Sequence, residues 1–475
     1  MKKIFLYLIP VALLVSCEKN IQKYNEFTKS AAIVPAGTLF ANATRNVSDI
    51  LASASVNTNP LRFTVKHWAM AVYQDEAQYD FSTRNIPQAW WSSLYRDVLN
   101  DLKESGRLIT ADATLDANVK ANQLAIVDLM QVYSYVILVN TFGDIPYTDA
   151  LDFNKLRPKY DDAKTVYFDL LKRVADDIGK LKTTSGSFSA SEDLVYKGSV
   201  AKWLKFANSM RMKMGMIIAD ADNATAKAAV EASDAGAMSS AADNALFTYL
   251  SATPNTNPLY ADIVLGGRGD YVAASDLMDQ LVALNDPRKP LYFGVNNAGL
   301  YQGGIVGKVN TYSDMSKPST QVSAATAPLV LLDYIETEFY RAEAIERGYT
   351  VAGTAESHYN NAITASILFW GGTAADASNY LATAPVAYTT ATGSYKQKIG
   401  TQKWIALYNR PFEEWTELRR LDFPVLTLAV AAKSGFPVRY QYPNNEQQLN
   451  KDNYTAAAAK IGGDKVETKL WWDKQ

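Results

Sequence analysis

The sequence predicts a mainly α-helical fold in which tetratricopeptide-like helix pairs form a superhelical scaffold with long loops. Three observations predict it. Apolar residues recur three or four positions apart, several helical segments are followed at once by a partner, and strand patterns are sparse. The chain has 475 residues, which is enough to bury a large core. We therefore expect one helical domain over residues 36–475.

Helical spacing is strongest in the first half of the chain. In 121–140, Leu124, Val127 and Met130 are each three residues apart, so they share one face of a helix. The same spacing continues in later segments. The predicted helices are 121–140, 165–181, 199–218, 224–235, 329–347, 358–370, 395–408 and 411–420.

One helix pair is explicit in the sequence. Residues 341–348 (RAEAIERG) place small residues at a crossing point and end in Gly348, and Tyr359 and Ala362 follow on the next helix. This pattern is typical of a tetratricopeptide unit. The spacing between successive pairs is irregular, so a regular 34-residue array is excluded.

Two long polar stretches interrupt the helices. Residues 250–328 and 371–394 are rich in Asn, Thr, Gly and Pro. Loops of this length in a compact protein are usually either functional or disordered. We expect them to be insertions on the helical scaffold.

The N-terminus predicts a lipoprotein signal peptide over residues 1–16. Two lysines precede the twelve-residue apolar run 4–15, which is shorter than the roughly 20 residues that a membrane-spanning helix needs. Leu-Val-Ser before Cys17 matches the bacterial lipobox, in which the cysteine is acylated. Cys17 is also the only cysteine. Residues 17–35 are then a lipidated tether that holds a water-exposed domain at a membrane.

Composition excludes several classes of function. Beyond residue 16 the chain has 45 basic and 49 acidic residues, a balance that argues against a nucleic-acid partner. One cysteine allows neither a disulfide nor a thiolate metal site. The sequence has only two histidines, His67 and His358, which argues against a nucleophilic triad based on histidine.

Two dense motifs have structural explanations. Residues 140–147 (NTFGDIPY) predict a helix stop, because Gly143 suits a left-handed end and Pro146 prevents the helix from resuming. In 413–424 (EEWTELRRLDFP), the paired carboxylates of Glu413 and Glu417 suggest a glycosidase. They lie on one helix beside two arginines, so a solvated, ion-paired face is the preferred interpretation. No other catalytic signature is present, and we expect no enzyme activity.

The motifs taken together resemble the SusD/RagB family of outer-membrane nutrient-binding lipoproteins, in particular its SusD-like branch. The resemblance covers nearly the whole chain. The matching segments are the lipobox at Cys17, FGDIPY at 142–147, KWLKFANSMRMK at 202–213, NDPR at 285–288, FYRAEA at 339–344, 413–424, YPNNEQQLNKDNY at 442–454 and LWWD at 470–473.

The resemblance implies a lipid-anchored protein on the outer surface of the cell. It further implies a SusC-like TonB-dependent transporter as partner and an oligosaccharide, or in some branches a peptide, as ligand. A third alternative is a scaffold that binds the transporter and no soluble ligand. No cofactor is expected, although the sequence leaves room for a structural calcium ion.

Sugar recognition requires aromatic faces for the C–H patches of the sugar ring and polar side chains for its hydroxyl groups. Two regions offer both, the loop from Tyr73 to Trp90 and the insertion 250–328. Trp91, Leu94 and Val98 continue at helical spacing and are assigned to the core. The candidate ligand-binding residues are Tyr79, Phe81, Arg84, Asn85, Trp90, Tyr260, Arg268 and Tyr301.

Overall fold

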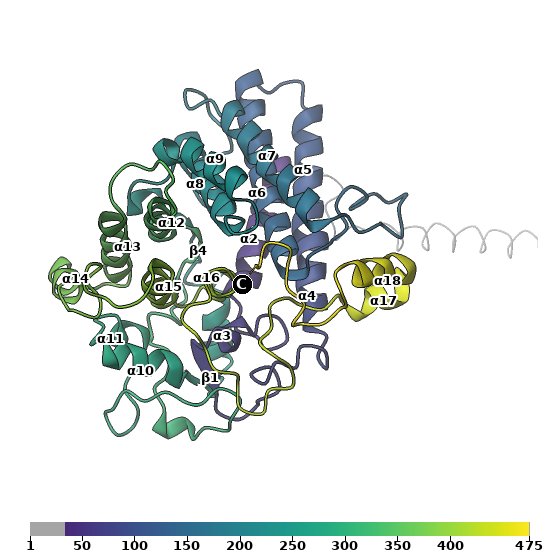
Figure 1. The fold of residues 1–475 in the computed structure, drawn as a ribbon. Helices are drawn as coiled ribbons and strands as arrows, with labels where there is room; N and C mark the ends of the chain where they lie inside the picture. Colours follow the sequence, from purple (N-terminus) through teal and green to yellow (C-terminus); the bar gives the residue numbers. More distant parts are fainter. Residues whose placement is uncertain (1–33, 475) are drawn as a thin grey trace, which may run out of the picture.

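The computed structural model describes residues 34–474, which form the predicted mainly helical fold (Figure 1). The signal peptide, Cys17 and the tether up to residue 33 lie outside the described residues. The first half contains α2 (Ala36–Ala52), α3 (Leu61–Thr64), α4 (Ile86–Ser92), η1 (Ser93–Leu99), α5 (Asn100–Ala111), α6 (Ala117–Phe142), α7 (Ala163–Lys180), α8 (Val200–Ile217) and α9 (Asn223–Ser233). The second half contains α10 (Ser275–Ala283), α11 (Lys289–Tyr292), α12 (Tyr334–Glu346), α13 (Ala355–Phe369), α14 (Ala374–Leu381), α15 (Tyr395–Ala406), α16 (Pro411–Leu421), α17 (Asn444–Leu449) and α18 (Lys451–Lys460).

Consecutive helices pack as pairs, which confirms the repeat-like architecture. The pairs are α6 with α7, α8 with α9, α12 with α13, and α15 with α16. In the pair predicted from sequence, Gly348 has a φ of 76° and ends the turn after α12, and Tyr359 is buried on α13. Gly215 shows how close such helices come, because a Cβ there would lie 3.1 Å from that of Ala229 on α9.

Helix α6 is the one described helix that is long and apolar enough to cross a membrane. Its most apolar stretch is 83% buried inside the protein, so it serves as a core helix. Asp116 caps its first turn by accepting hydrogen bonds from two backbone amides. At its other end Gly143 has a φ of 87°, as the helix-stop motif predicts. Asp144 Oδ1 then accepts from the amide of Ala163 at 2.8 Å, which ties this stop to the start of α7.

The strands are few and short. β1 (Trp68–Met70) pairs antiparallel with β3 (Tyr271–Ala273), and β2 (Ala245–Phe247) pairs antiparallel with β4 (Leu329–Leu332). The helix predicted over 329–347 was therefore wrong in its first four residues. All four residues of β4 are buried, and a short, fully buried apolar run has no periodicity that separates strand from helix.

The two predicted insertions contain more structure than their composition suggests. Residues 250–328 include β3, α10, α11, the π-helical turn η4 (Tyr260–Leu265) and η5 (Tyr312–Asp314), and 371–394 includes α14. The first insertion surrounds the β1–β3 pair in the lower part of Figure 1. The second closes over α13. Both insertions are thus extensions of the helical body.

The dense charges of 413–424 are buried, which corrects the solvated face predicted for them. Glu413 and Glu417 are 5% and 2% exposed. The Arg420 guanidinium contacts both carboxylate oxygens of Glu343 at 2.6 Å, and Lys403 Nζ lies 3.0 Å from Glu417. We call this cluster of buried charged residues the ionic core. Besides Glu343, Lys403, Glu413, Glu417 and Arg420, it contains Lys213, Asp333, Glu336, Arg410 and Glu414. The predicted pairing is present, but away from solvent.

Candidate functional site

Three of the predicted ligand-binding aromatics lie in the protein interior. Tyr79, Phe81 and Trp90 are 3%, 2% and 0% exposed. The rings of Phe81 and Trp90 pack against Tyr440, and Trp90 Nε1 donates to the carbonyl of Thr58. These three rings anchor the loop to the core and present no face to a ligand. The predicted core residues Trp91, Leu94 and Val98 are buried, as expected.

Arg84 and Asn85 lie at the surface but make structural contacts. The Arg84 guanidinium lies 2.5 Å from the carboxylate of Glu76, and it also donates to Asn57 at 3.3 Å. Asn85 has a φ of 49° just before α4, and its Oδ1 accepts from the amide of Asn444. Both side chains therefore stabilise the loop.

The three candidates in the insertion are half-buried. Tyr260 opens η4, and Tyr301 has Lys289 Nζ 5.0 Å from its ring centre. The Arg268 guanidinium stacks 4.8 Å from the ring of Tyr271, and its Nε donates to Asp270 at 2.8 Å. Arg268 thus lies at a loop junction, next to Gly269, where a Cβ would lie 3.9 Å from the ring of Tyr312.

Exposed aromatic rings are rare in this protein. Among residues 34–474, only Tyr73, Phe153 and Tyr312 are classed as exposed aromatics, with 58%, 85% and 38% of their surface accessible. Each tyrosine lies in one of the two regions singled out from sequence, near the β1–β3 pair. Phe153 belongs to a different loop, between α6 and α7.

Backbone hydrogen bonds bring the two regions together. The amide of Asn310 donates to the carbonyl of Ala71 at 2.9 Å, so Tyr73 and Tyr312 are each two residues from the same contact. The amide of Ala71 donates to Asp270, and that of Val430 donates to Val306. We call the resulting surface the loop face. It comprises residues 72–80, 264–270, 305–314 and 425–433.

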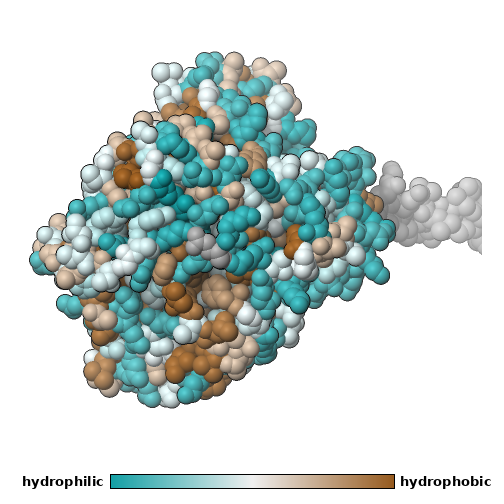
Figure 2. Space-filling view, in the orientation of Figure 1, coloured by the Kyte–Doolittle hydropathy of each residue, from teal (hydrophilic) through white to brown (hydrophobic). Residues whose placement is uncertain are grey.

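The loop face is apolar at many points and polar between them. Figure 2 shows hydrophobic side chains gathered over the loops in the lower half of the molecule. The exposed apolar residues on these segments are Val72, Tyr73, Val264, Leu265, Ile305, Val309, Tyr312, Val425, Leu428 and Val430. A cluster of this kind on a soluble domain is typical of an interaction surface.

Charges on the loop face are paired locally. Lys433 Nζ lies 3.3 Å from Asp75 and 3.1 Å from Asp80. Burial raises the pKa of Asp80, but hydrogen bonds from Thr83 and Lys433 outweigh it and lower this pKa to about 2. Lys317 Nζ lies 4.8 Å from the ring centre of Tyr312. The arrangement offers tyrosine faces beside paired charges, which suits a neutral ligand with both C–H and hydroxyl surfaces.

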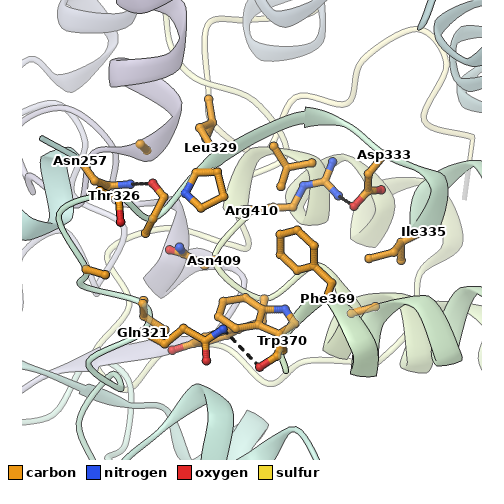
Figure 3. A pocket seen from close by; sticks show the side chains of 18 residues that line it. Asn257, Gln321, Thr326, Leu329, Asp333, Ile335, Phe369, Trp370, Asn409 and Arg410 are labelled. Atoms are coloured by element: carbon orange, nitrogen blue, oxygen red, sulfur yellow. Dashed lines mark hydrogen bonds and ion pairs between the residues drawn. The ribbon is translucent and has the colours of Figure 1, made fainter. Parts of the chain in front are cut away.

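A separate cavity of about 300 Å³ lies between the end of α2, β4 and the ends of α13 and α15. Figure 3 shows Phe369 and Trp370 on one side of it, with Asn257 and Thr326 on another. Arg410 and Asp333 form part of its lining, with Nη1 and Oδ2 3.1 Å apart. Because Arg410 is neutralised by this carboxylate and by Glu336, the cavity also suits a neutral guest. Its polar lining residues Asn257, Gln321 and Thr326 lie within the insertion 250–328 that the sequence singled out.

The histidines have structural roles, as expected. His67 is fully buried with Nε2 3.0 Å from the carbonyl of Trp404, and burial lowers its pKa to about 3. His358 Nδ1 lies 2.9 Å from Glu338. Within residues 34–474, no group of three or more His, Cys, Asp or Glu is placed to hold a metal ion. A loop-bound calcium ion remains an untested prediction.

The two loops singled out from the sequence carry exposed tyrosines, but the candidate residues drawn from these loops do not include Tyr73 or Tyr312. Tyr73 marked only the start of the first loop, and Tyr312 was one of several tyrosines in the second. The signal that could have separated buried from exposed rings was the residues next to each ring in the sequence. Tyr79 and Phe81 alternate with acidic residues like a strand with one buried side, whereas Tyr73 follows β1 and precedes Gln74 and Asp75.

The scaffold and the loop face together define a class: a helical-repeat protein that presents an exposed apolar surface built from loops. The particular family follows from comparison with known proteins. The family described as "Starch-binding associating with outer membrane", SusD-like, matches residues 26–443, and the chain belongs to it.

Solved structures agree with this assignment. A chitin-binding protein is 26% identical with a TM-score of 0.81, covering 93% of this chain and 100% of its own. A SusD-like protein from Bacteroides thetaiotaomicron VPI-5482 is 24% identical with a TM-score of 0.77, covering 93% and 99%. A chitin-binding SusD homolog from Flavobacterium johnsoniae is 22% identical with a TM-score of 0.78, covering 92% and 99%. No curated protein matches the chain.

Proposed function

We propose that this protein is a lipid-anchored lipoprotein of the outer cell surface. It captures an oligosaccharide on its loop face and delivers it to a SusC-like TonB-dependent outer-membrane transporter. Acylation at Cys17 provides the anchor. The protein binds its ligand without cleaving it.

One observation carries the proposal. The only two exposed tyrosines of the described chain lie on neighbouring loops that backbone hydrogen bonds hold together. A tyrosine face covers the apolar side of a sugar ring, and the polar side chains between the loops can bond its hydroxyl groups. Membership of a family described as starch-binding, and similarity to a chitin-binding protein at 26% identity, support a glycan as the ligand.

The test is native affinity electrophoresis of residues 18–475 through gels that contain different polysaccharides, followed by calorimetry with oligosaccharides of any that retard the protein. We expect Tyr73→Ala and Tyr312→Ala each to weaken binding about tenfold, since losing one sugar–ring contact costs about 1.4 kcal/mol. Phe153→Ala is the matched control, because it removes the remaining exposed aromatic ring from a loop outside the loop face.

Other outcomes of these experiments would place the sugar at a different site or indicate a different ligand. If both tyrosine variants bind normally and Thr326→Trp, which fills the cavity mouth, abolishes binding, the sugar occupies the cavity. If no polysaccharide retards the protein while the transporter is recovered with it, the ligand is a peptide or another nutrient, or the protein is a scaffold. Release of reducing ends would contradict a pure binding role.

A further inference from the structure

The loop between α6 and α7 carries the two most exposed large apolar side chains of the described protein. Phe153 and Leu156 are 85% and 87% accessible, more than any apolar residue of the loop face. Isolated exposed apolar residues are ordinary on protein surfaces. Two at one loop tip, each almost fully hydrated, indicate a partner that takes them out of water.

The loop is held in a defined shape that leaves these two side chains outside. Asp152 Oδ1 accepts from the amide of Asn154 at 2.9 Å, which makes the turn before Leu156. Lys155 Nζ contacts Asp149 at 2.6 Å. At the end of the loop, Asn450 Nδ2 donates to the carbonyl of Pro158 at 2.8 Å. The projection of the tip is therefore a property of the fold.

Charges of both signs surround the tip. Asp149 is paired with Lys155, and Asp152 keeps its negative charge while it accepts hydrogen bonds in the turn. Arg157 is exposed and makes no ion pair with another residue of 34–474. This guanidinium, beside the apolar tip, can contact a lipid phosphate, which is worth roughly 1 kcal/mol near an anionic membrane.

The size of the patch argues against a protein partner. Leu449, 68% exposed on α17, is the remaining large apolar residue nearby, since α17 and α18 hold the end of this loop. Three such side chains offer a few hundred Å², whereas a stable protein interface buries about 1,200 Å² or more in total. A projecting tip of this size matches insertion into a lipid surface.

The tip lies on the same side of the molecule as the start of the described chain. On α5, Lys103 Nζ donates to the carbonyl of Leu151 at 2.6 Å, and two residues later Ser105 Oγ donates to the carbonyl of Ala36 at 2.8 Å. The loop and the start of α2 thus flank one turn of one helix, itself about 10 Å wide. The eighteen residues from Cys17 to Val34 span at most about 60 Å, so an anchored chain keeps this turn within that distance of the membrane.

We propose that the tip formed by Phe153 and Leu156 inserts into the lipid surface to which the protein is anchored, as a second membrane contact beside the acylated cysteine. The inference rests on the lipid anchor of the proposed function. Two contacts fix an orientation that one tether leaves free. The loop face is then held at a defined angle to the membrane in which the transporter lies.

The experiment uses mature protein acylated at Cys17 and reconstituted in vesicles of phosphatidylethanolamine and phosphatidylglycerol. Phe153→Cys receives an environment-sensitive dye, which acylated Cys17, the only native cysteine, cannot take. We expect several-fold brighter, blue-shifted emission that lipids with spin-labelled acyl chains quench. Val425→Cys, at a residue 79% exposed on the loop face, is the control and keeps its aqueous emission. Adding Leu156→Ser to the labelled variant reduces the blue shift.

Aqueous emission from residue 153 in vesicles, equal to that from residue 425, would overturn the proposal. So would protection of residue 153 only after purified transporter is added, since the loop would then be a protein contact. Failure of the anchor is separable: if the mature protein does not float with vesicles, a histidine tag before residue 18 on nickel-chelating lipid replaces the acyl chains. Emission from residue 153 then tests insertion alone.

Discussion

The ionic core and the loop face use charged and aromatic residues in opposite ways. In the ionic core, Arg420 and Glu343 are 4% and 0% exposed, and these two charges are paired with each other. On the loop face, Tyr73 and Val309 are more than half exposed, and Lys433 pairs with its neighbours in solvent. The charged residues of 413–424, which resemble a catalytic motif in the sequence, stabilise the helical scaffold. The residues that we propose to meet a ligand are ordinary apolar and aromatic side chains at the surface.

The energetic contrast explains this division. A buried charge without a partner costs several kcal/mol, so every member of the ionic core constrains the others. An exposed ring or a solvated ion pair contributes little to stability. The loop face can therefore change its side chains at small cost to the fold.

The largest expected effect is in the ionic core. Arg420→Met keeps the apolar stem and removes the charge, so Glu343 and Glu417 lose their shared partner. We expect the free energy of unfolding to fall by about 3 to 5 kcal/mol, toward the lower end because Arg347 and Lys403 remain. Denaturant unfolding measures it.

Arg107→Met is the matched control. Arg107 contacts Glu104 through two nitrogens, as Arg420 contacts Glu343, but its side chain is 63% exposed. Its loss should change stability little. If the two variants are destabilised equally, burial is not what separates the two regions.

A second prediction concerns pH and Glu414. Burial raises the pKa of this carboxyl well above 4.5, and its Oε2 has no hydrogen-bond partner among the described residues. The unfolded chain loses this proton near pH 4.5 and the folded chain only at higher pH. Between those values the folded state holds more protons, so its stability falls as pH rises.

The Glu414→Gln side chain cannot ionise, so the stability of this variant does not fall with rising pH on account of residue 414. We expect the variant to match the native protein near pH 4 and to become relatively more stable above about pH 4.5, by about 1.4 kcal/mol per pH unit within the window. Unfolding curves across pH measure the difference. A constant difference at all pH values would mean that Glu414 is already ionised in the fold.

The smallest effect belongs to the loop face. Lys433→Met removes a cation that lowers the pKa of Asp80, now about 2. This pKa should rise toward its ordinary value yet stay below it, since the hydrogen bonds from Thr83 remain. Carboxyl titration by NMR measures the shift. If Lys433→Met unfolds the protein, the ion pairs of the loop face are required for the stability of the fold.

Much of the scaffold was predictable because helix periodicity is a local property. The helix over 121–140 was found within four residues at its start and two at its end, and its stop at Gly143 has the expected geometry. β4 was missed because Leu329–Leu332 is apolar on both faces. Exposure was not predictable from residue type. Tyr73 and Tyr79 have the same side chain six residues apart, and only tertiary packing against 429–440 buries the second.

The loop face is assembled from three distant parts of the chain, joined by hydrogen bonds from the backbone amide of Asn310 to the carbonyl of Ala71 and from that of Val430 to the carbonyl of Val306. Both contacts span more than one hundred residues, and contacts this far apart in sequence slow folding because a long loop must close before they form. No fragment that ends before residue 430 contains the complete surface. A chain that ends before residue 430 would keep most of its helices and lack part of the loop face. Helical content alone therefore cannot report whether the loop face is intact.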